Sequence, residues 1–382
     1  MIKIKSDKII VNGGLFDGFL YVDNGVIVDV TDKDLPSGVS YDYTGSYVSP
    51  GFIETHTHGG GGYPFLSGSV ESVLKACDFH LSHGATTIVP TVSTDSFSAM
   101  KNSVKDISLA KRSGKSKAKI LGAHLEGPYL SEKQSGAQSG GNIKSPIEEE
   151  YKGLIEEFKG DIARWTYAPE KDLDGNFCKY LKSCGIIVSA GHTDAVYSDM
   201  KKAAENGCNL ITHLYSCTST ITRNKGFRSL GVIESAYLLD EIFVEIIADG
   251  KHLPPELIKM IIKIKGADRV ILTTDSLEIA GSGVTSGVMS GVEYEVEDGV
   301  CKLKDRSGFA GSIATCDALI RTLVNECGYE VPFAVKMLTE TPAKLFSLNC
   351  GVLAKGKDAD VVVLDKDLSV TSVFVGGEKI KP

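Results

Sequence analysis

Residues 50–58 read Pro-Gly-Phe-Ile-Glu-Thr-His-Thr-His, a short apolar run that ends in two histidines. Four further apolar runs end in the same way, on a side chain of a kind that binds metals. These end residues are Glu126, His192, His213 and Asp275. In (β/α) barrels the carboxyl ends of the strands meet at one face, where the chemistry gathers. The repeated pattern therefore predicts a metal site at one end of a barrel.

Between residues 49 and 345, strand-like runs alternate with helical stretches. The strand candidates begin near Phe52, Thr86, Ile120, Ala163, Ile186, Asn209, Phe243 and Val270. Eight such units predict an α/β fold with a closed (β/α)8 barrel of the TIM type. A doubly wound open sheet is the alternative, but no Gly-x-Gly-x-x-Gly follows the first strand. Residues 291–303 alternate around a Glu-Asp-Gly turn, which predicts a β-hairpin inserted above the barrel mouth as a candidate lid.

The two ends of the chain predict a second, smaller unit. Residues 1–48 contain several strand-like runs, two of which flank the turn signal Asp23-Asn24-Gly25. Residues 346–382 contain similar runs before Gly376-Gly377. We expect the two ends to pair into one small β-sandwich, discontinuous in sequence, with the barrel of residues 49–345 between them.

Composition narrows the class of protein. The chain has 382 residues, room for a large barrel of about 250–300 residues plus a smaller module. Its net charge of −8 and the absence of a basic block argue against nucleic acid or an anionic membrane as a partner. No apolar run approaches the ~20 residues that span a bilayer, and no signal peptide is expected. Nine cysteines without a Cys-x-x-Cys pattern predict reduced thiols in a cytoplasmic protein.

His56 and His58 form the first candidate constellation. Residues two apart on a strand point to the same side, so both imidazoles can reach one ion. Four glycines follow at 59–62 and leave room for a ligand. The alternative is two polar residues that merely end a strand.

The later strand ends supply the remaining candidates. Glu126 is expected to be a metal carboxylate and a candidate bridge between two ions, whereas His124 is expected to hydrogen-bond rather than to bind metal. His192 and His213 are each, taken singly, more often structural histidines. With Glu126 they provide three ligands and leave a position open for water, as catalytic sites do. Asp275 is a candidate general acid and base, with a helix N-cap as the alternative.

With these residues in place, the chain is similar to the amidohydrolase superfamily and, within it, resembles the N-acetylglucosamine-6-phosphate deacetylases. The matching segments run in family order over nearly the whole chain. They are residues 50–59, 124–130 (His-Leu-Glu-Gly-Pro-Tyr-Leu), 168–170, 191–195, 212–215, 248–252, 274–275, 310–312, 342–344 and 356–360. The His-Leu-Glu-Gly-Pro segment is specific to this branch.

The resemblance implies a role for each matching position. It implies that Glu126, His192 and His213 hold the principal metal, and that His56 and His58 belong to a second metal site. It assigns Asp275 as the catalytic acid and base. The implied cofactor is therefore one or two divalent ions, and the ligand types suit zinc, iron, manganese or cobalt.

The resemblance also implies the substrate contacts. Arg223 and His252 are expected to bind a sugar phosphate, and in relatives this arginine can come from the neighbouring subunit, which implies a homodimer. The sugar itself is expected to lie against Ala137, Gln138, Phe309, Ala310 and Gly311.

Three departures from the family pattern lie in substrate contacts. Ser216 and Cys217 stand where the family usually has Asn-Ala, some relatives carry histidine in place of Gln138, and Arg223 aligns only if one residue is deleted. These changes leave the metal ligands intact and put the identity of the sugar in doubt.

The expected reaction is hydrolysis of N-acetylglucosamine 6-phosphate to glucosamine 6-phosphate and acetate. The alternatives are deacetylation of N-acetylgalactosamine 6-phosphate, hydrolysis of a cyclic amide or an N-acyl amino acid, and a non-catalytic sugar-phosphate binder.

Overall fold

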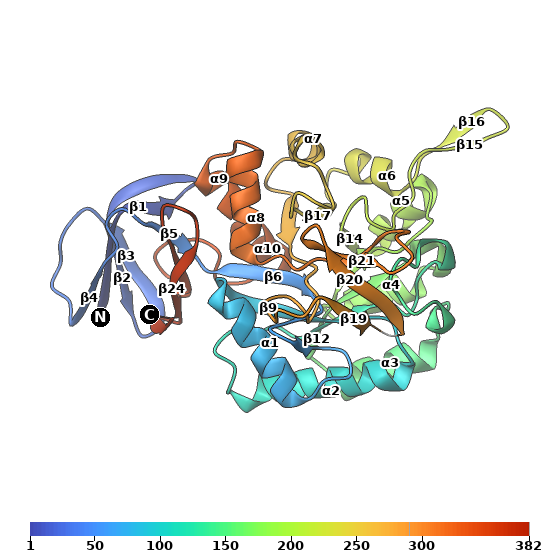
Figure 1. Ribbon diagram of the computed structural model, residues 1–382, viewed down its shortest axis with the longest axis horizontal. Coiled ribbons are helices and arrows are strands. Elements are labelled where there is room, and N and C mark those ends of the chain that lie inside the picture. The colour runs from blue at the N-terminus through green and yellow to red at the C-terminus, as the bar shows by residue number, and fades with distance from the viewer. Residues whose placement is uncertain (290, 382) are drawn as a thin grey trace.

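The structure is a computed structural model that describes residues 1–289 and 291–381. Its centre is a barrel of eight parallel strands, which confirms the fold predicted from the alternating pattern (Figure 1). The barrel strands are β6 (Phe52–Thr57), β9 (Ala85–Val92), β11 (Ala123–Glu126), β12 (Ile162–Tyr167), β13 (Ile187–Ala190), β14 (Cys208–Ile211), β17 (Phe243–Ile247) and β18 (Val270–Thr273), with the short β10 (Lys119–Ile120) before β11. Neighbouring strands pair in sequence order from β6 to β18.

The barrel closes between β6 and β18 at its carboxyl end. The backbone N–H of Asp275 donates to the carbonyl of His56 at 3.0 Å, and that of His58 donates to the carbonyl of Ser276 at 2.8 Å. These bonds tie the first and last strands together at the level where the predicted metal ligands lie.

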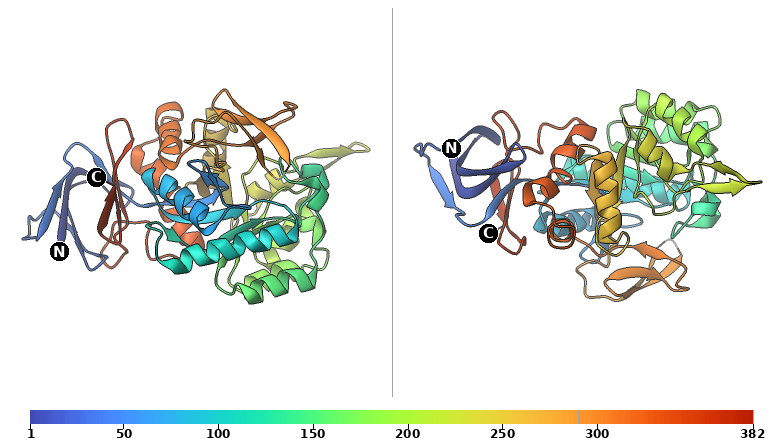
Figure 2. Two further views of the ribbon diagram at one scale, coloured as in Figure 1. Left: turned by 60° about the horizontal axis from the view of Figure 1, so that its bottom comes forward. Right: turned by 90° about the horizontal axis from the view of Figure 1, so that it is seen from above.

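Helices cover the outside of the barrel (Figures 1 and 2). They are α1 (Val70–Ser82), α2 (Phe97–Ser113), α3 (Glu148–Glu157), α4 (Asn176–Ser183), α5 (Tyr197–Asn206), α6 (Val232–Leu238), α7 (Pro255–Lys265), α8 (Cys316–Arg321), α9 (Val331–Lys336) and α10 (Glu340–Phe346). Short 3-10 turns cover Glu132–Gln134, Gly140–Asn142 and Pro169–Lys171, and one π-helical turn covers Thr322–Glu326. The longest helix, α2, has Ser96 as its N-cap, whose hydroxyl accepts from the N–H of Ala99, and Gly114 in the left-handed conformation as its C-cap. No helix among the described residues is long and apolar enough to cross a membrane.

Both ends of the chain build one eight-stranded sheet beside the barrel (Figure 1). Its strands are β1 (Ile2–Val11), β2 (Gly14–Asp23), β3 (Val26–Thr31), β4 (Val39–Asp42), β5 (Tyr47–Pro50), β23 (Val361–Leu364), β24 (Val370–Val375) and β25 (Glu378–Lys381). The pairing of β5 with β23 joins the two ends. Asn24 and Gly25 have φ of 49° and 78°, as the predicted turn between β2 and β3 requires. The sheet has an apolar core of its own.

Two insertions lie at the carboxyl end of the barrel. The predicted hairpin at 291–303 is present as β20 (Val292–Glu297) and β21 (Val300–Leu303), but it belongs to a larger four-stranded sheet with β19 (Ser286–Met289) and β22 (Phe309–Gly311). A second hairpin, β15 (Thr222–Asn224) and β16 (Phe227–Ser229), projects away from the barrel (Figures 1 and 2). A small ladder joins β7 (Gly59–Gly60) to β8 (Tyr63–Pro64).

Candidate metal centre and substrate cavity

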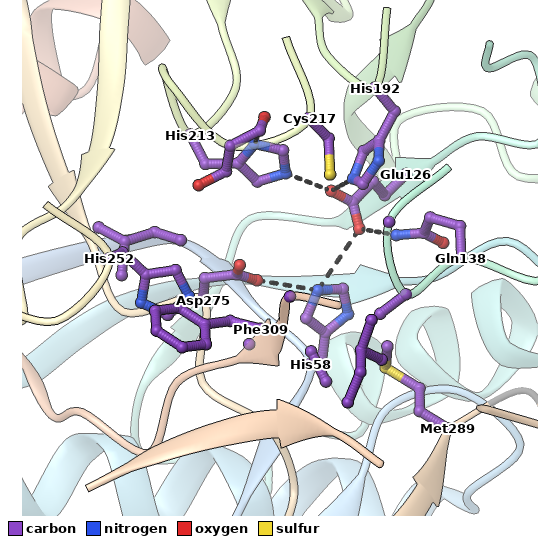
Figure 3. Close-up of a pocket in the computed structure, with 18 of the residues that line it drawn as sticks. His58, Glu126, Gln138, His192, His213, Cys217, His252, Asp275, Met289 and Phe309 are labelled. Atoms are coloured by element: carbon purple, nitrogen blue, oxygen red, sulfur yellow. Dashed lines mark hydrogen bonds and ion pairs between the residues drawn. The ribbon is translucent and has the colours of Figure 1, made fainter. Parts of the chain in front are cut away.

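Six side chains from five strand ends converge at the carboxyl face of the barrel: His56, His58, Glu126, His192, His213 and Asp275. Figure 3 shows all of them except His56. Glu126 is at their centre. Its Oε1 lies 3.1 Å from Nε2 of His192 and 3.0 Å from Nε2 of His213. Its Oε2 lies 3.4 Å from Nε2 of His58, and Nε2 of His56 is 3.5 Å from Oε1. Oε1 of Glu126 thus lies near His56, His192 and His213, and Oε2 lies near His58.

These spacings suit metal ligands. Bonds of about 2.0–2.1 Å in a tetrahedral site put neighbouring ligand atoms about 3.3–3.4 Å apart. Two groups of three side chains, each with its ligand atoms within 4.8 Å of one another, share Glu126: one contains His192 and His213, the other His56 and His58. The donor set is imidazole and carboxylate, the chemistry that first-row divalent ions take. The structure therefore has room for two ions that share one carboxylate.

The outer ring nitrogens of the four histidines all have hydrogen-bond partners. Nδ1 of His192 lies 2.9 Å from the carbonyl of Gln134, and Nδ1 of His213 lies 3.1 Å from the carbonyl of Ser216. Nδ1 of His58 lies 2.8 Å from Oγ of Ser93.

The fourth histidine has a charged partner, because Nδ1 of His56 lies 2.9 Å from a carboxylate oxygen of Glu245. A carbonyl or carboxylate partner at Nδ1 requires the proton there and leaves Nε2 as the free ligand atom. The surroundings thus orient all four Nε2 atoms toward Glu126.

The electrostatics of the cluster favour positive charge beside the carboxylates. Burial opposes the protonated form of His56, but Glu126, Asp275 and Glu245 outweigh it and raise the pKa of His56 to about 10. Burial likewise opposes the charge on Glu126, but His56 and His192 hold its pKa well below the usual range. A divalent cation at the same place would take over the role of the ring proton.

The residues at the strand ends adopt left-handed backbone conformations. The φ angles are 46° at His192, 27° at His213 and 47° at Asp275, and nearby Tyr215 and Cys217 have 79° and 50°. Such conformations are uncommon for residues other than glycine, although asparagine, aspartate and histidine adopt them more often than most, and they cluster at functional sites. His192, His213 and Asp275 thus share this uncommon conformation where β13, β14 and β18 end.

Asp275 lies on the opposite side of the cluster from His192. Its Oδ1 is 3.0 Å from Nε2 of His58 and 3.4 Å from Nε2 of His56. Burial raises the pKa of Asp275, but His56 and His58 outweigh burial and lower it. The carboxylate is therefore ionised and faces the cavity next to the proposed ligands.

A cavity of about 480 Å³ opens directly above these residues. Eight of the nine predicted substrate residues line it: Ala137, Gln138, Ser216, Cys217, His252, Phe309, Ala310 and Gly311. Its wall also includes Met289, Leu303 and Ser307 of the inserted sheet region, which the sequence analysis did not single out. Its volume is typical of a small-molecule site.

The ninth predicted substrate residue, Arg223, does not line the cavity of its own chain. It lies on β15, in the hairpin that projects from the barrel, and is exposed. The prediction that Arg223 contacts the substrate is therefore not met within one subunit.

Two cavity residues have additional contacts. Gln138 donates from Nε2 to Oε2 of Glu126 at 2.6 Å, and its Oε1 accepts from the N–H of Thr94 at 2.8 Å. Gln138 thus orients Glu126 as well as lining the cavity. Nδ1 of His252 lies 2.8 Å from Oδ2 of Asp249, which fixes the ring against Phe309 at the cavity wall.

The remaining histidines have structural contacts. Both ring nitrogens of His124 meet hydroxyls, at 3.0 Å from Thr91 and 2.7 Å from Thr166, as expected for a hydrogen-bonding residue. Its pKa is lowered by burial and by Arg164, so the ring is neutral. His80 is buried beside the carbonyl of Gly59. All nine cysteines are free of disulfide bonds.

Three buried charged residues beneath the centre were not predicted from the sequence: Glu54, Arg164 and Glu245. Each lies inside a barrel strand and is fully buried. A charged residue in the middle of an apolar strand, as in Phe243–Ile247, is the signal that would have found them, because buried charges need partners.

Comparison with known proteins agrees with this geometry. The model of the amidohydrolase family matches residues 47–380. The chain belongs to the amidohydrolase family. It is 31% identical to the N-acetylglucosamine-6-phosphate deacetylase of Bacillus subtilis, over 87% of this chain and 84% of that protein. It is also 30% identical to the N-acetylgalactosamine-6-phosphate deacetylase of a Shewanella species, over 88% and 84% of the two chains.

Solved structures of the family show the same fold. A variant of N-acetyl-D-glucosamine-6-phosphate deacetylase from Mycobacterium smegmatis, solved in complex with N-acetyl-D-glucosamine-6-phosphate, superposes with a TM-score of 0.92. The two chains are 29% identical, and the match covers 100% of this chain and 99% of that one.

Proposed function

We propose that this amidohydrolase removes the acetyl group from an N-acetylhexosamine 6-phosphate, with N-acetylglucosamine 6-phosphate as the first candidate, and releases acetate. The observation that carries the proposal is the convergence of Glu126, His192, His213 and Asp275 on the floor of one cavity. The family members that the chain resembles are named for this reaction on the gluco and the galacto sugar.

Glu126, His192 and His213 would hold the principal divalent ion, and His56 and His58 would hold a second ion with Glu126 as the bridge. Zinc, iron, manganese and cobalt all suit these ligands. When bound, such an ion supplies Lewis-acid chemistry, since it acidifies a water ligand and polarises a carbonyl oxygen.

Asp275 would be the group that moves the proton. It is ionised, faces the cavity and has no arginine or lysine partner among its described contacts. It can therefore accept the proton of the attacking water and return it to the departing nitrogen, which must leave as an amine.

The phosphate requires positive charge that one subunit does not provide. None of the described residues that line the cavity is a lysine or an arginine, and His252 is the wall residue proposed to contact the phosphate. The hairpin that carries Arg223 projects from the barrel and exposes Phe227 and Ile221 to 80% and 51%. A second copy of the chain would cover these apolar side chains and bring the partner subunit's Arg223 to this cavity. We therefore propose a homodimer whose sites are shared.

A mixed dimer tests this arrangement. A dimer in which both chains carry Arg223→Ala should have a higher KM for the phosphorylated sugar and little change in kcat, because this arginine is proposed to position the phosphate. A chain with Arg223→Ala keeps its own Asp275 and, in a dimer with an Asp275→Asn chain, would receive an intact arginine from the partner. Mixed dimers should therefore recover about half of the parent activity per dimer at low substrate concentration. No recovery above the sum of the two variants would show that Arg223 does not act across subunits.

The identity of the sugar is decided by assay. Similar relatives include enzymes named for both epimers, and Ser216 and Cys217 line the cavity where the family sequence differs. Acetate release should be measured on the 6-phosphates of N-acetylglucosamine, N-acetylgalactosamine and N-acetylmannosamine, with the unphosphorylated sugars as controls. We expect the gluco substrate to have the highest kcat/KM. Turnover of unphosphorylated amides alone would refute the proposed substrate class.

A further inference from the structure

A buried ion pair lies directly beneath the candidate metal centre. Arg164 of β12 and Glu245 of β17 are both fully buried. Nη1 of Arg164 donates to Oε2 of Glu245 at 2.5 Å, and Nη2 donates to Oε1 at 3.1 Å. This bidentate pairing fixes the plane of the carboxylate.

Every N–H of the Arg164 guanidinium has an acceptor. Beyond Glu245, these are Oγ of Ser189 at 3.1 Å, the carbonyl of Thr55 at 3.1 Å and Oγ1 of Thr212 at 2.8 Å. The acceptors come from β6, β13 and β17 and from Thr212, which directly follows β14. The guanidinium is therefore held rigidly, and through it the carboxylate of Glu245.

Glu245 makes its other short side-chain contacts with β6, and its Oε1 also accepts a longer bond of 3.4 Å from the backbone N–H of His213. Its Oε1 lies 2.9 Å from Nδ1 of His56, and its Oε2 accepts from Oγ1 of Thr55 at 2.8 Å. Of the four converging histidines, His56 is the one whose Nδ1 meets a carboxylate. Two of the others meet main-chain carbonyls and the third meets a hydroxyl.

We infer that Glu245, held in place by Arg164, is the positioning residue that sets how tightly the group of His56, His58 and Glu126 binds its ion. The inference rests on the proposed metal centre. A carboxylate behind a histidine ligand makes the ring a stronger donor and fixes its orientation, and loss of such a partner costs about 10–100-fold in metal affinity. The effect should be larger for this ion, because Glu245 contacts the ring of His56 at 2.9 Å, whereas its contact with the other group is a longer bond of 3.4 Å from the backbone N–H of His213.

The test is a titration of the metal-free chain with cobalt(II). Binding is monitored by calorimetry and by the visible absorption of the bound ion. The parent chain should take up two ions in two steps. In the Glu245→Gln variant, the binding step of the group that contains His56 should lose about 10–100-fold in affinity. The affinity of the other step should change by less than about threefold. This split separates positioning of His56 from general damage to the core, which would weaken both steps.

Two further variants guard against misfolding. Glu245→Gln leaves Arg164 buried without its counter-charge, so the double variant Arg164→Gln/Glu245→Gln, which removes both charges, should show the same selective loss. Ser189→Ala removes a hydrogen bond to Arg164 but leaves the contact between Glu245 and His56, and should bind both ions like the parent. Circular dichroism checks that each variant is folded.

The outcomes are distinct. Unchanged two-step binding in both Gln variants, an equal loss in both steps, or uptake of a single ion by the parent overturns the inference and leaves the proposed reaction standing. A parent chain that binds no cobalt contradicts the metal centre itself, and with it the proposed function.

Discussion

Substitution of Asp275 by asparagine isolates proton transfer from the other features of the site. Asp275 has a φ of 47°, a conformation that asparagine tolerates and that alanine adopts only with strain. Its backbone N–H, which closes the barrel by donating to His56, is unaffected by the change. The variant should therefore keep the fold, the cavity and one side-chain oxygen facing His58.

The expected loss follows from the chemistry that the amide cannot perform. An amide does not take up a proton at neutral pH, so the variant loses the group proposed to accept and return one. General acid and base catalysis by a placed side chain contributes about 10²–10⁴ in rate, or about 2.7–5.5 kcal/mol of barrier. We expect kcat to fall by this factor, with KM changed by less than about threefold.

The assay is acetate release from N-acetylglucosamine 6-phosphate, with metal content measured on the same samples. A matched control is Asp317→Asn, which also neutralises a buried carboxylate, paired with His83 and Arg321 on the outer side of the barrel. It should lower stability and leave kcat within about twofold. A kcat for Asp275→Asn within tenfold of the parent, at equal metal content, would refute the role given to Asp275.

Further predictions concern pH and packing. Because the folded-state pKa of His56 is raised to about 10, a proton occupies the ring below that pH and an incoming ion must displace it. Metal affinity should therefore rise with pH between 6 and 9, and calorimetry in buffers of different ionisation enthalpy should show proton release; pH-independent binding would contradict this. Gly191→Ala would place a Cβ 2.7 Å from Cβ of Thr212 and 2.8 Å from Cγ2 of Thr166. Such overpacking costs about 1–3 kcal/mol, so thermal unfolding should show a lower Tm and metal analysis a weaker hold on the ion by His192.

The barrel and the convergence of its ligands could be predicted because both follow from local patterns. Eight apolar runs separated by helical stretches leave few parallel topologies. Once strands such as β11 and β14 run parallel in one closed barrel, the residues at their carboxyl ends, Glu126 and His213, must lie at one face. The turn at Asn24 and Gly25 could also be predicted, because it too follows from a local sequence pattern.

Other features depend on contacts that the local pattern does not record. The alternation in residues 291–303 indicated a hairpin, but its pairing with β19 and β22 joins segments separated by loops. The position of Arg223 depends on the path of a projecting hairpin. Its distance in sequence from the other candidate residues therefore could not predict which residues it contacts within one chain. Glu245 and Arg164 meet across the barrel from strands 81 residues apart, and only the fold makes them partners.

The measurement that tests the central claim most directly is anomalous diffraction from crystals of the chain grown with zinc or cobalt. We predict a peak about 2.0–2.2 Å from Oε1 of Glu126 and from Nε2 of both His192 and His213. Crystals that contain the metal but show no peak between these three side chains would contradict the account.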